Sequence, residues 1–220
     1  MSMNPIIKSF NPDISKNAYM NWRTDQKDIV RNLIVMADGY YEAAKMLADA
    51  VLENNNGKKA DALVYPMVFD LNQSMELYLK ASQWMLNRLN RCTNTFENGH
   101  NLIGLYYTML RLIKDFTKNH PDYPFDQKLF NHMMSGVDSY IDELKHIIPE
   151  NDWKSMDYPR YPIMSDKATP HFYIIDSDKV TIDIEYFRMR AEGIHDALES
   201  LTMQLQELCE SLSFSASTTT

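Results

Sequence analysis

The chain has 220 residues, and its 22 lysines and arginines against 30 aspartates and glutamates give a formal net charge of −8. A chain of this length is expected to form one domain, and its 45% hydrophobic content is sufficient for a core. Only six glycines are present, which excludes collagen-like and glycine-rich chains. The acidic balance excludes an overall basic field for nonspecific binding of nucleic acid, so any such contact would need a local patch.

Several classes of protein and site are excluded by what the sequence lacks. The longest apolar runs are far shorter than the roughly 18 residues that cross a bilayer, so no membrane helix is expected. The first residues do not resemble a secretory signal peptide, and the two cysteines make no disulfide framework, which predicts a cytoplasmic, reducing compartment. No two histidines lie three or four positions apart and no glycine-rich phosphate loop occurs, so neither a metal nor a cofactor is expected.

Helical periodicity dominates the first two thirds of the chain. Residues 1–21 contain two prolines and no sustained period, which predicts an irregular arm. Residues 22–212 are expected to form one helical bundle, because apolar residues recur there every three or four positions. Its first four helices are predicted to run from about Trp22 to the Asn54–Gly57 stretch, over about 61–91, from His100 or Asn101 to about 119, and over 126–148.

The last third of the chain changes character. Residues 150–181 contain three prolines and strand-like runs, so a short extended or hairpin insertion is predicted there. The last helix is expected from Ile184 to Leu212, where leucines alternate at spacings of four and three, and the tail at 213–220 is expected to be disordered. The predicted fold is therefore an all-α, up-and-down bundle of about five long helices with this insertion before the last one.

Two stretches carry polar residues within or beside otherwise apolar helices. Residues 69–81 contain Glu76 and Lys80, four positions apart and in the favourable order for an intrahelical ion pair. The stretch Gly99–Leu102 places His100 and Asn101 at a predicted helix start. A side chain there can cap free backbone N–H groups, and the positive end of the helix dipole can also attract a phosphate. Structural capping and phosphate binding both remain open for this stretch.

Together these two stretches resemble the HEPN domain (higher eukaryotes and prokaryotes nucleotide-binding), which has Glu-Leu-x-Leu-Lys-Ala on one helix and Gly-His-x-Leu at the start of the next. The resemblance covers about residues 22–212 and includes an Arg-Tyr-Pro stretch at 160–162. It implies a helical up-and-down bundle, usually dimeric. Such bundles occur in nucleotide-binding modules, in partners of minimal nucleotidyltransferases and in metal-independent ribonucleases of toxin and phage-defence systems. By this resemblance, the nucleotide-binding residues are Glu76, Lys80, His100, Asn101 and Arg160.

The ribonuclease branch of the family uses an arginine followed, after four to six residues, by a histidine on the last long helix. Here Arg190 precedes His195 with four residues between them, and Arg188 precedes it with six. On an α-helix Arg188 lies about 20° from His195 around the axis and Arg190 roughly 140° away, so Arg188 shares the face of His195. The histidine would act as general acid or base on RNA, and the arginine would stabilise charge on the phosphate.

A structural interpretation of the same residues stays open. Ala191 follows Arg190 where active members of the family carry a polar residue, and the acidic Glu192 and Asp196 flank the motif. The alternative is a solvated helix face of intrahelical ion pairs.

Three functions are compatible with these patterns. The first is a HEPN-like module that binds a nucleotide or RNA, with a regulatory or defence role. The second is a metal-independent endoribonuclease that uses Arg188 or Arg190 with His195, and the third is a dimeric scaffold without a ligand. A homodimer joined through long helices is expected, with an antitoxin or a nucleotidyltransferase as a further candidate partner and no membrane contact.

Overall fold

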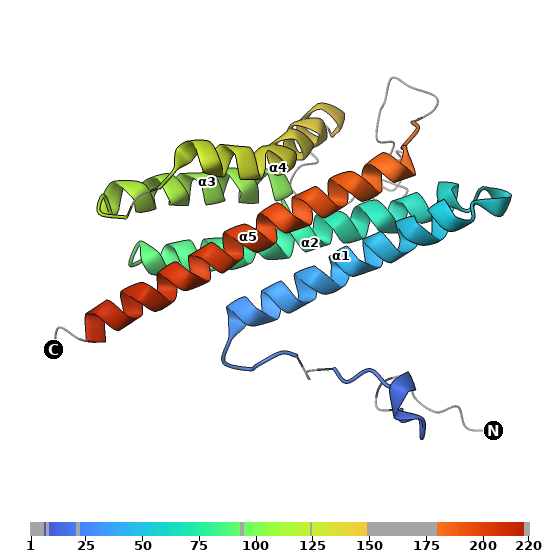
Figure 1. The fold of residues 1–220 in the computed structure, drawn as a ribbon, viewed down its shortest axis with the longest axis horizontal. Helices are drawn as coiled ribbons and strands as arrows, with labels where there is room; N and C mark the ends of the chain where they lie inside the picture. Colours follow the sequence, from blue (N-terminus) through green and yellow to red (C-terminus); the bar gives the residue numbers. More distant parts are fainter. Residues whose placement is uncertain are drawn as a thin grey trace.

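The computed structural model describes residues 7, 9–20, 23–92, 95–123, 125–148 and 180–217. Within these residues five long α-helices pack against one another and no strand occurs (Figure 1). The all-α bundle that the sequence predicts is therefore confirmed. The long helices are α1 (Ile29–Glu53), α2 (Ala60–Leu89), α3 (Leu102–Asn119), α4 (Gln127–Ile147) and α5 (Ile184–Ser217), and two short 3-10 helices, Ile14–Lys16 and Asn56–Lys58, lie before α1 and between α1 and α2.

Side-chain caps set the beginnings of α1, α3 and α4. The Asp28 carboxylate accepts a hydrogen bond from the backbone N–H of Arg31 at 2.9 Å and begins α1. The Asn101 side chain accepts one from the N–H of Gly104 at 2.9 Å and begins α3. Between α1 and α2 the backbone reverses at Gly57, whose φ of 70° lies in the left-handed region that glycine adopts at least cost.

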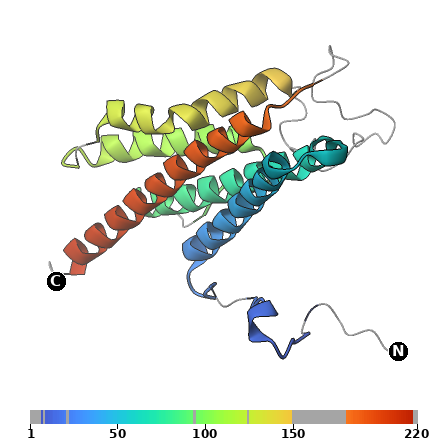
Figure 2. The same ribbon diagram turned by 45° about the vertical axis from the view of Figure 1, so that its right-hand side comes forward.

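Helix α2 lies at the centre of the bundle and packs against α1, α3 and α5 (Figures 1 and 2). Pro66 lies in its second turn, where it has no N–H to donate to the backbone oxygen of Ala62. Because neighbouring helices cover most of its circumference, α2 buries polar side chains as well as apolar ones. The buried polar residues of α2 are Asn72, Ser74, Glu76, Lys80, Ser82 and Gln83.

Helix α3 runs parallel to α2, which departs from strict up-and-down order. The Gln83 side chain donates to the backbone oxygen of Leu105 at 2.9 Å, and the Asn90 side chain donates to that of Leu112 at 3.1 Å, so both helices advance in the same direction. The connection at 90–101 permits this return, because twelve residues can span roughly 40 Å when extended. Figure 1 shows that the other consecutive helices alternate in direction.

Helix α5 crosses α1, α2 and α4 and contributes a row of buried leucines to the core. It continues to Ser217, five residues past the Leu212 at which the leucine spacing ends. The predicted insertion, with Arg160, falls almost entirely on residues outside those described, and Val180–Asp183 form no regular element. Among the described helices, none is both long and apolar enough to cross a membrane.

Candidate functional site

Three of the four described residues assigned to nucleotide binding make direct contact between α2 and the start of α3. Lys80 Nζ lies 2.8 Å from Glu76 Oε1, and both residues are buried, with 8% and 5% of their surface exposed. His100 Nδ1 lies 3.1 Å from both oxygens of the Glu76 carboxylate. One carboxylate therefore binds the ammonium group of Lys80 and the imidazole of His100.

This first cluster holds two helices together. Asn101, beside it in the chain, caps α3 rather than joining the cluster, so the polar residue at the helix start has a structural partner. The Lys80 ammonium is neutralised by Glu76 and also lies over the Phe96 ring, 5.4 Å from its centroid. Its charge is thus satisfied inside the protein, whereas the His100 side chain is half-exposed.

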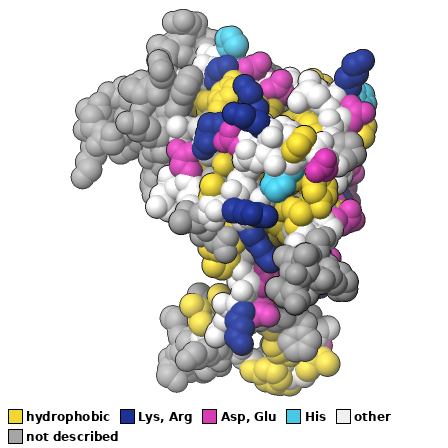
Figure 3. Space-filling model, turned by 90° about the vertical axis from the view of Figure 1, so that its left-hand side faces the viewer, with side chains coloured by type: hydrophobic (Ala, Val, Ile, Leu, Met, Phe, Trp, Pro, Cys, Tyr) yellow, Lys and Arg dark blue, Asp and Glu magenta, His cyan; other side chains and the backbone are white. Residues whose placement is uncertain are grey.

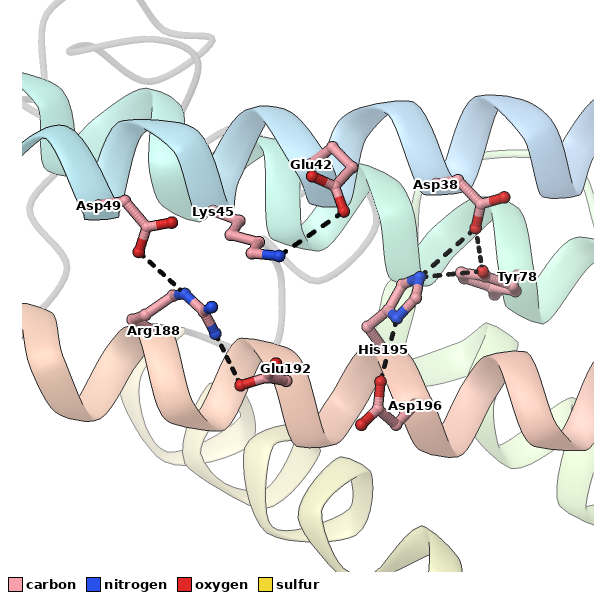
Figure 4. A network of polar contacts seen from close by, with 9 residues as sticks. All are labelled: Asp38, Glu42, Lys45, Asp49, Tyr78, Arg188, Glu192, His195 and Asp196. Atoms are coloured by element: carbon pink, nitrogen blue, oxygen red, sulfur yellow. Dashed lines mark hydrogen bonds and ion pairs between the residues drawn. The ribbon is translucent and has the colours of Figure 1, made fainter.

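A second cluster forms around His195, on the side of α5 that faces α1 (Figure 4). His195 Nε2 lies 3.4 Å from Asp38 Oδ1 and 3.3 Å from the Tyr78 hydroxyl, which also forms a short hydrogen bond to Asp38 Oδ1. His195 Nδ1 lies 3.4 Å from Asp196 Oδ1. The imidazole stacks on the Tyr41 ring with centroids 3.9 Å apart and planes inclined by 16°. Three helices thus position one histidine, whose side chain is only 13% exposed.

The neighbours of His195 shift the protonation equilibria of the cluster. Burial opposes protonation of His195, but contacts with Asp38 and Asp196 outweigh it and raise its pKa above 6.5. Burial would raise the pKa of Asp38, but hydrogen bonds from His195 and Tyr78 lower it. Burial, followed by the bond to Asp38, raises the pKa of the Tyr78 hydroxyl. These directions describe an ionised Asp38 beside an imidazole that favours its charged form.

Arg188 lies on the same side of α5, one heptad before His195. Its Nε lies 3.1 Å from Asp49 Oδ1 on α1, and its Nη1 lies 2.7 Å from Glu192 Oε2, one turn further along α5. Figure 4 shows Arg188 and His195 both reaching toward α1 from α5, with Glu192 between them along the helix. The seven-residue spacing places the two side chains as helical geometry predicts.

Arg190 does not belong to this group. Its guanidinium lies 2.9 Å from Glu143 on α4 and 3.2 Å from the Tyr186 hydroxyl, so it faces the opposite side of α5. Ala191, which follows it, is 1% exposed. Within one copy of the chain, Arg190 and His195 are therefore not brought together.

Carboxylates outnumber cations on the α1–α5 face. Asp38, Asp49 and Asp196 contact its cationic side chains, and Glu42 and Glu192 each pair with one of them. Lys45 and Arg188 supply the positive charge, to which His195 adds when it is protonated. At the end of the bundle shown in Figure 3, Lys and Arg side chains are likewise interleaved with acidic and hydrophobic ones.

One group of side chains among the described residues could hold a metal ion. Ligand atoms of His195, Asp196 and Glu199, all within about one turn of α5, lie within 4.8 Å of one another. The two acidic residues are exposed.

Sequence reasoning missed three members of the His195 cluster. Asp38, Tyr41 and Tyr78 lie 157, 154 and 117 positions from His195, and no local pattern connects them. The one local signal is Asp38 itself, a charged residue beside apolar positions of α1.

Comparisons of the chain with protein-family models, with curated proteins and with solved structures gave no match.

Proposed function

We propose that this chain is a HEPN-like module that binds RNA or a nucleotide, and that a phosphate of the ligand meets α5 at Arg188 and His195. The observation that supports this site is that both side chains lie on the α1-facing side of one helix. The Glu76–Lys80 pair serves the same module structurally, by joining α2 to the start of α3. His100, which contacts Glu76 of this pair, has a half-exposed side chain.

The ligand would replace carboxylates that now neutralise Arg188. Both Asp49 and Glu192 are half-exposed, so their side chains can turn to solvent, where an ion pair with arginine is worth only about 0–1 kcal/mol. A phosphate accepts two parallel hydrogen bonds from a guanidinium and can compete with them. Binding by displacement fits a site that lies within an acidic chain.

The binding proposal is tested with a fluorescently labelled single-stranded RNA and fluorescence anisotropy. Arg188→Ala should weaken binding by about tenfold, the value of one charge-assisted contact. Arg190→Ala is the matched control, because it removes the same type of side chain from the same helix on the side that faces α4. Equal affinities of wild type and Arg188→Ala would contradict the proposal.

A second candidate function is metal-independent RNA cleavage at the same site. It is favoured by His195, a largely buried histidine that lies between two carboxylates and has a raised pKa, on the face that also holds Arg188. A histidine of this kind can transfer a proton, and the arginine can stabilise charge that develops on phosphate.

The cleavage assay uses mixed RNA in EDTA with the wild type, His195→Gln and His132→Ala. His132 is an exposed histidine on α4 and serves as the control. Cleavage by the wild type and by His132→Ala, lost in His195→Gln, would support the enzyme. RNA binding without cleavage by any of the three would leave the binding module as the function.

We propose that the module acts as a homodimer joined through its long helices. Each of the five long helices exposes at least one large apolar side chain, among them Met46 on α1, Leu129 on α4 and Met189 on α5, and a second chain packed on these helices would cover such residues. Light scattering after size exclusion should give twice the mass of one chain. A monomeric mass at assay concentration would contradict this arrangement.

A further inference from the structure

The hydrogen bonds around His195 define which of its two nitrogens is free to act. Asp38 is ionised in this setting and can only accept hydrogen bonds, and the Tyr78 hydroxyl gives its single proton to Asp38. The Tyr78 oxygen can then offer only a lone pair to His195. Since Nε2 of His195 faces both acceptors, at 3.4 and 3.3 Å, it must carry a hydrogen.

The other ring nitrogen lies on the exposed side of the cluster. Nδ1 of His195 is 3.4 Å from Asp196 Oδ1, the same distance as from Nε2 to Asp38 Oδ1, so the two nitrogens differ in the surroundings of their partners. The Asp196 side chain is 68% exposed and free to turn away, whereas Tyr78 is fully buried. Stacking on Tyr41, with ring centroids 3.9 Å apart, fixes the plane of the imidazole.

We propose that Asp38 is a positioning residue that holds Nε2–H of His195 and directs Nδ1–H at a phosphate group of the ligand. The inference deepens the proposed function, because it depends on His195 as the residue that meets the ligand. In the binding module, Nδ1–H donates a hydrogen bond to a phosphate oxygen. Tyr78 supports the arrangement by holding the Asp38 carboxylate from the buried side.

In RNA cleavage the same geometry makes Nδ1 the proton donor. The 2′-oxygen forms a bond to phosphorus while its proton passes to water, and the bond from phosphorus to the 5′-oxygen breaks. The departing 5′-oxygen takes the proton from Nδ1, which leaves a neutral imidazole with its hydrogen on Nε2, held by Asp38. No metal, oxidant or reductant enters this balance.

The test is a spectroscopic one on the full chain labelled with ¹⁵N. Long-range ¹H–¹⁵N correlation spectra recorded across a pH titration give the tautomer and the pKa of His195, assigned by the signals absent from His195→Gln. In the wild type the neutral ring should be the Nε2–H tautomer. Asp38→Asn should mix the tautomers and lower the pKa of His195, because it removes a carboxylate that favours the charged ring. Glu42→Gln, one turn away on α1 and paired with Lys45, should change neither.

An Nδ1–H tautomer in the wild type would overturn the inference, and so would an Asp38→Asn variant whose tautomer and titration match the wild type. If Asp38→Asn does not fold, the wild-type tautomer alone decides. Addition of an RNA that is 2′-O-methylated throughout, and so cannot be cleaved, should shift the Nδ1 signal and leave Nε2 nearly unchanged. Failure of the proposed function can be told apart from failure of this inference. RNA that binds without changing the His195 signals would contradict the proposed binding site, whereas the tautomer measured without RNA would still support the role of Asp38.

Discussion

The ammonium of Lys80 lies 2.8 Å from the carboxylate of Glu76 on the same helix, although both side chains are almost completely buried. Removing two charges from water costs several kcal/mol per ion unless their pairing is close and further hydrogen bonds satisfy the remaining atoms. Glu76 has such a further partner in His100. The pair therefore depends on the position of α3 as much as on its own spacing of four residues.

This dependence predicts different outcomes for breaking and for replacing the pair. Glu76→Ala leaves a buried ammonium without its counter-ion and should lower the free energy of unfolding by about 3–5 kcal/mol. The double variant with Glu76→Leu and Lys80→Met removes both charges at similar volume and should cost less than the single change. Urea denaturation followed by circular dichroism measures both. A single variant that loses under 1 kcal/mol would show that the pair is not buried in solution.

The pH dependence of stability should reveal His195. Its pKa is higher in the folded chain than the 6.5 of an exposed histidine, so the folded state binds the proton more tightly. The stabilisation is complete below about pH 6.5 and is lost as the pH rises through the folded pKa. The groups that face the imidazole are Asp38 and Tyr41 from α1, Tyr78 from α2, and Asp196 with Glu199 from α5.

The measurement is the difference in unfolding free energy between the wild type and His195→Gln from pH 5.5 to 8.5. The advantage of the wild type should shrink as the pH rises. His132→Ala, which removes an exposed histidine from α4, is the control for the loss of a histidine elsewhere on the chain. A His195→Gln difference that does not change with pH would contradict the raised pKa.

Asp70 on α2 should oppose folding at neutral pH. Burial raises the pKa of this half-buried carboxyl to about 6, which means that its charged form is disfavoured in the folded chain. The proton on Asp70 stabilises the folded state in full below about pH 4, and this stabilisation is lost as the pH rises through 6.

Asp70→Asn should therefore raise the free energy of unfolding at pH 7.5 by about 1 kcal/mol, after allowance for solvent screening at a half-exposed group. At pH 4 the gain should be close to zero. Glu207→Gln, which changes an exposed carboxylate on α5, is the control and should be neutral at both values. If Asp70→Asn were less stable than the wild type at pH 7.5, the charged form of Asp70 would not be disfavoured in the folded chain.

Local sequence patterns were sufficient to predict the helices and the side of a helix on which several site residues lie. The cap at Asn101, the spacing from Glu76 to Lys80 and the seven positions from Arg188 to His195 each involve one helix or one helix end. Such features depend on backbone geometry that every α-helix shares, so they can be derived without the tertiary structure.

The surroundings of His195 could not be derived in the same way. Its contacts with Asp38 and Tyr78 depend on how far α1, α2 and α5 slide along one another, and a shift of one turn, 5.4 Å, would break all of them. The parallel run of α2 and α3 likewise depends on the path of the 90–101 connection. Packing among many side chains determines both, and neither leaves a periodic signal.

Neutralising one carboxylate beside Arg188 should strengthen the binding of RNA. Glu192 lies 2.7 Å from Arg188 and between it and His195 along α5, so its charge both occupies the guanidinium and repels an incoming phosphate. Glu192→Gln removes that charge and should tighten binding by about threefold to tenfold, which corresponds to roughly 1 kcal/mol for a charge at this distance near the surface.

The matched control is Glu143→Gln, which removes the same charge from the partner of Arg190 on the opposite side of α5 and should leave affinity within about twofold. Because the effect is electrostatic, the gain from Glu192→Gln should decrease as salt rises from about 0.05 to 0.5 M. Combining Glu192→Gln with Arg188→Ala separates local from general charge effects. If the Glu192 carboxylate weakens binding by occupying Arg188, Glu192→Gln should hardly change the affinity for RNA in a chain that already carries Arg188→Ala. If Glu192→Gln tightens binding equally in that chain, the ligand binds elsewhere.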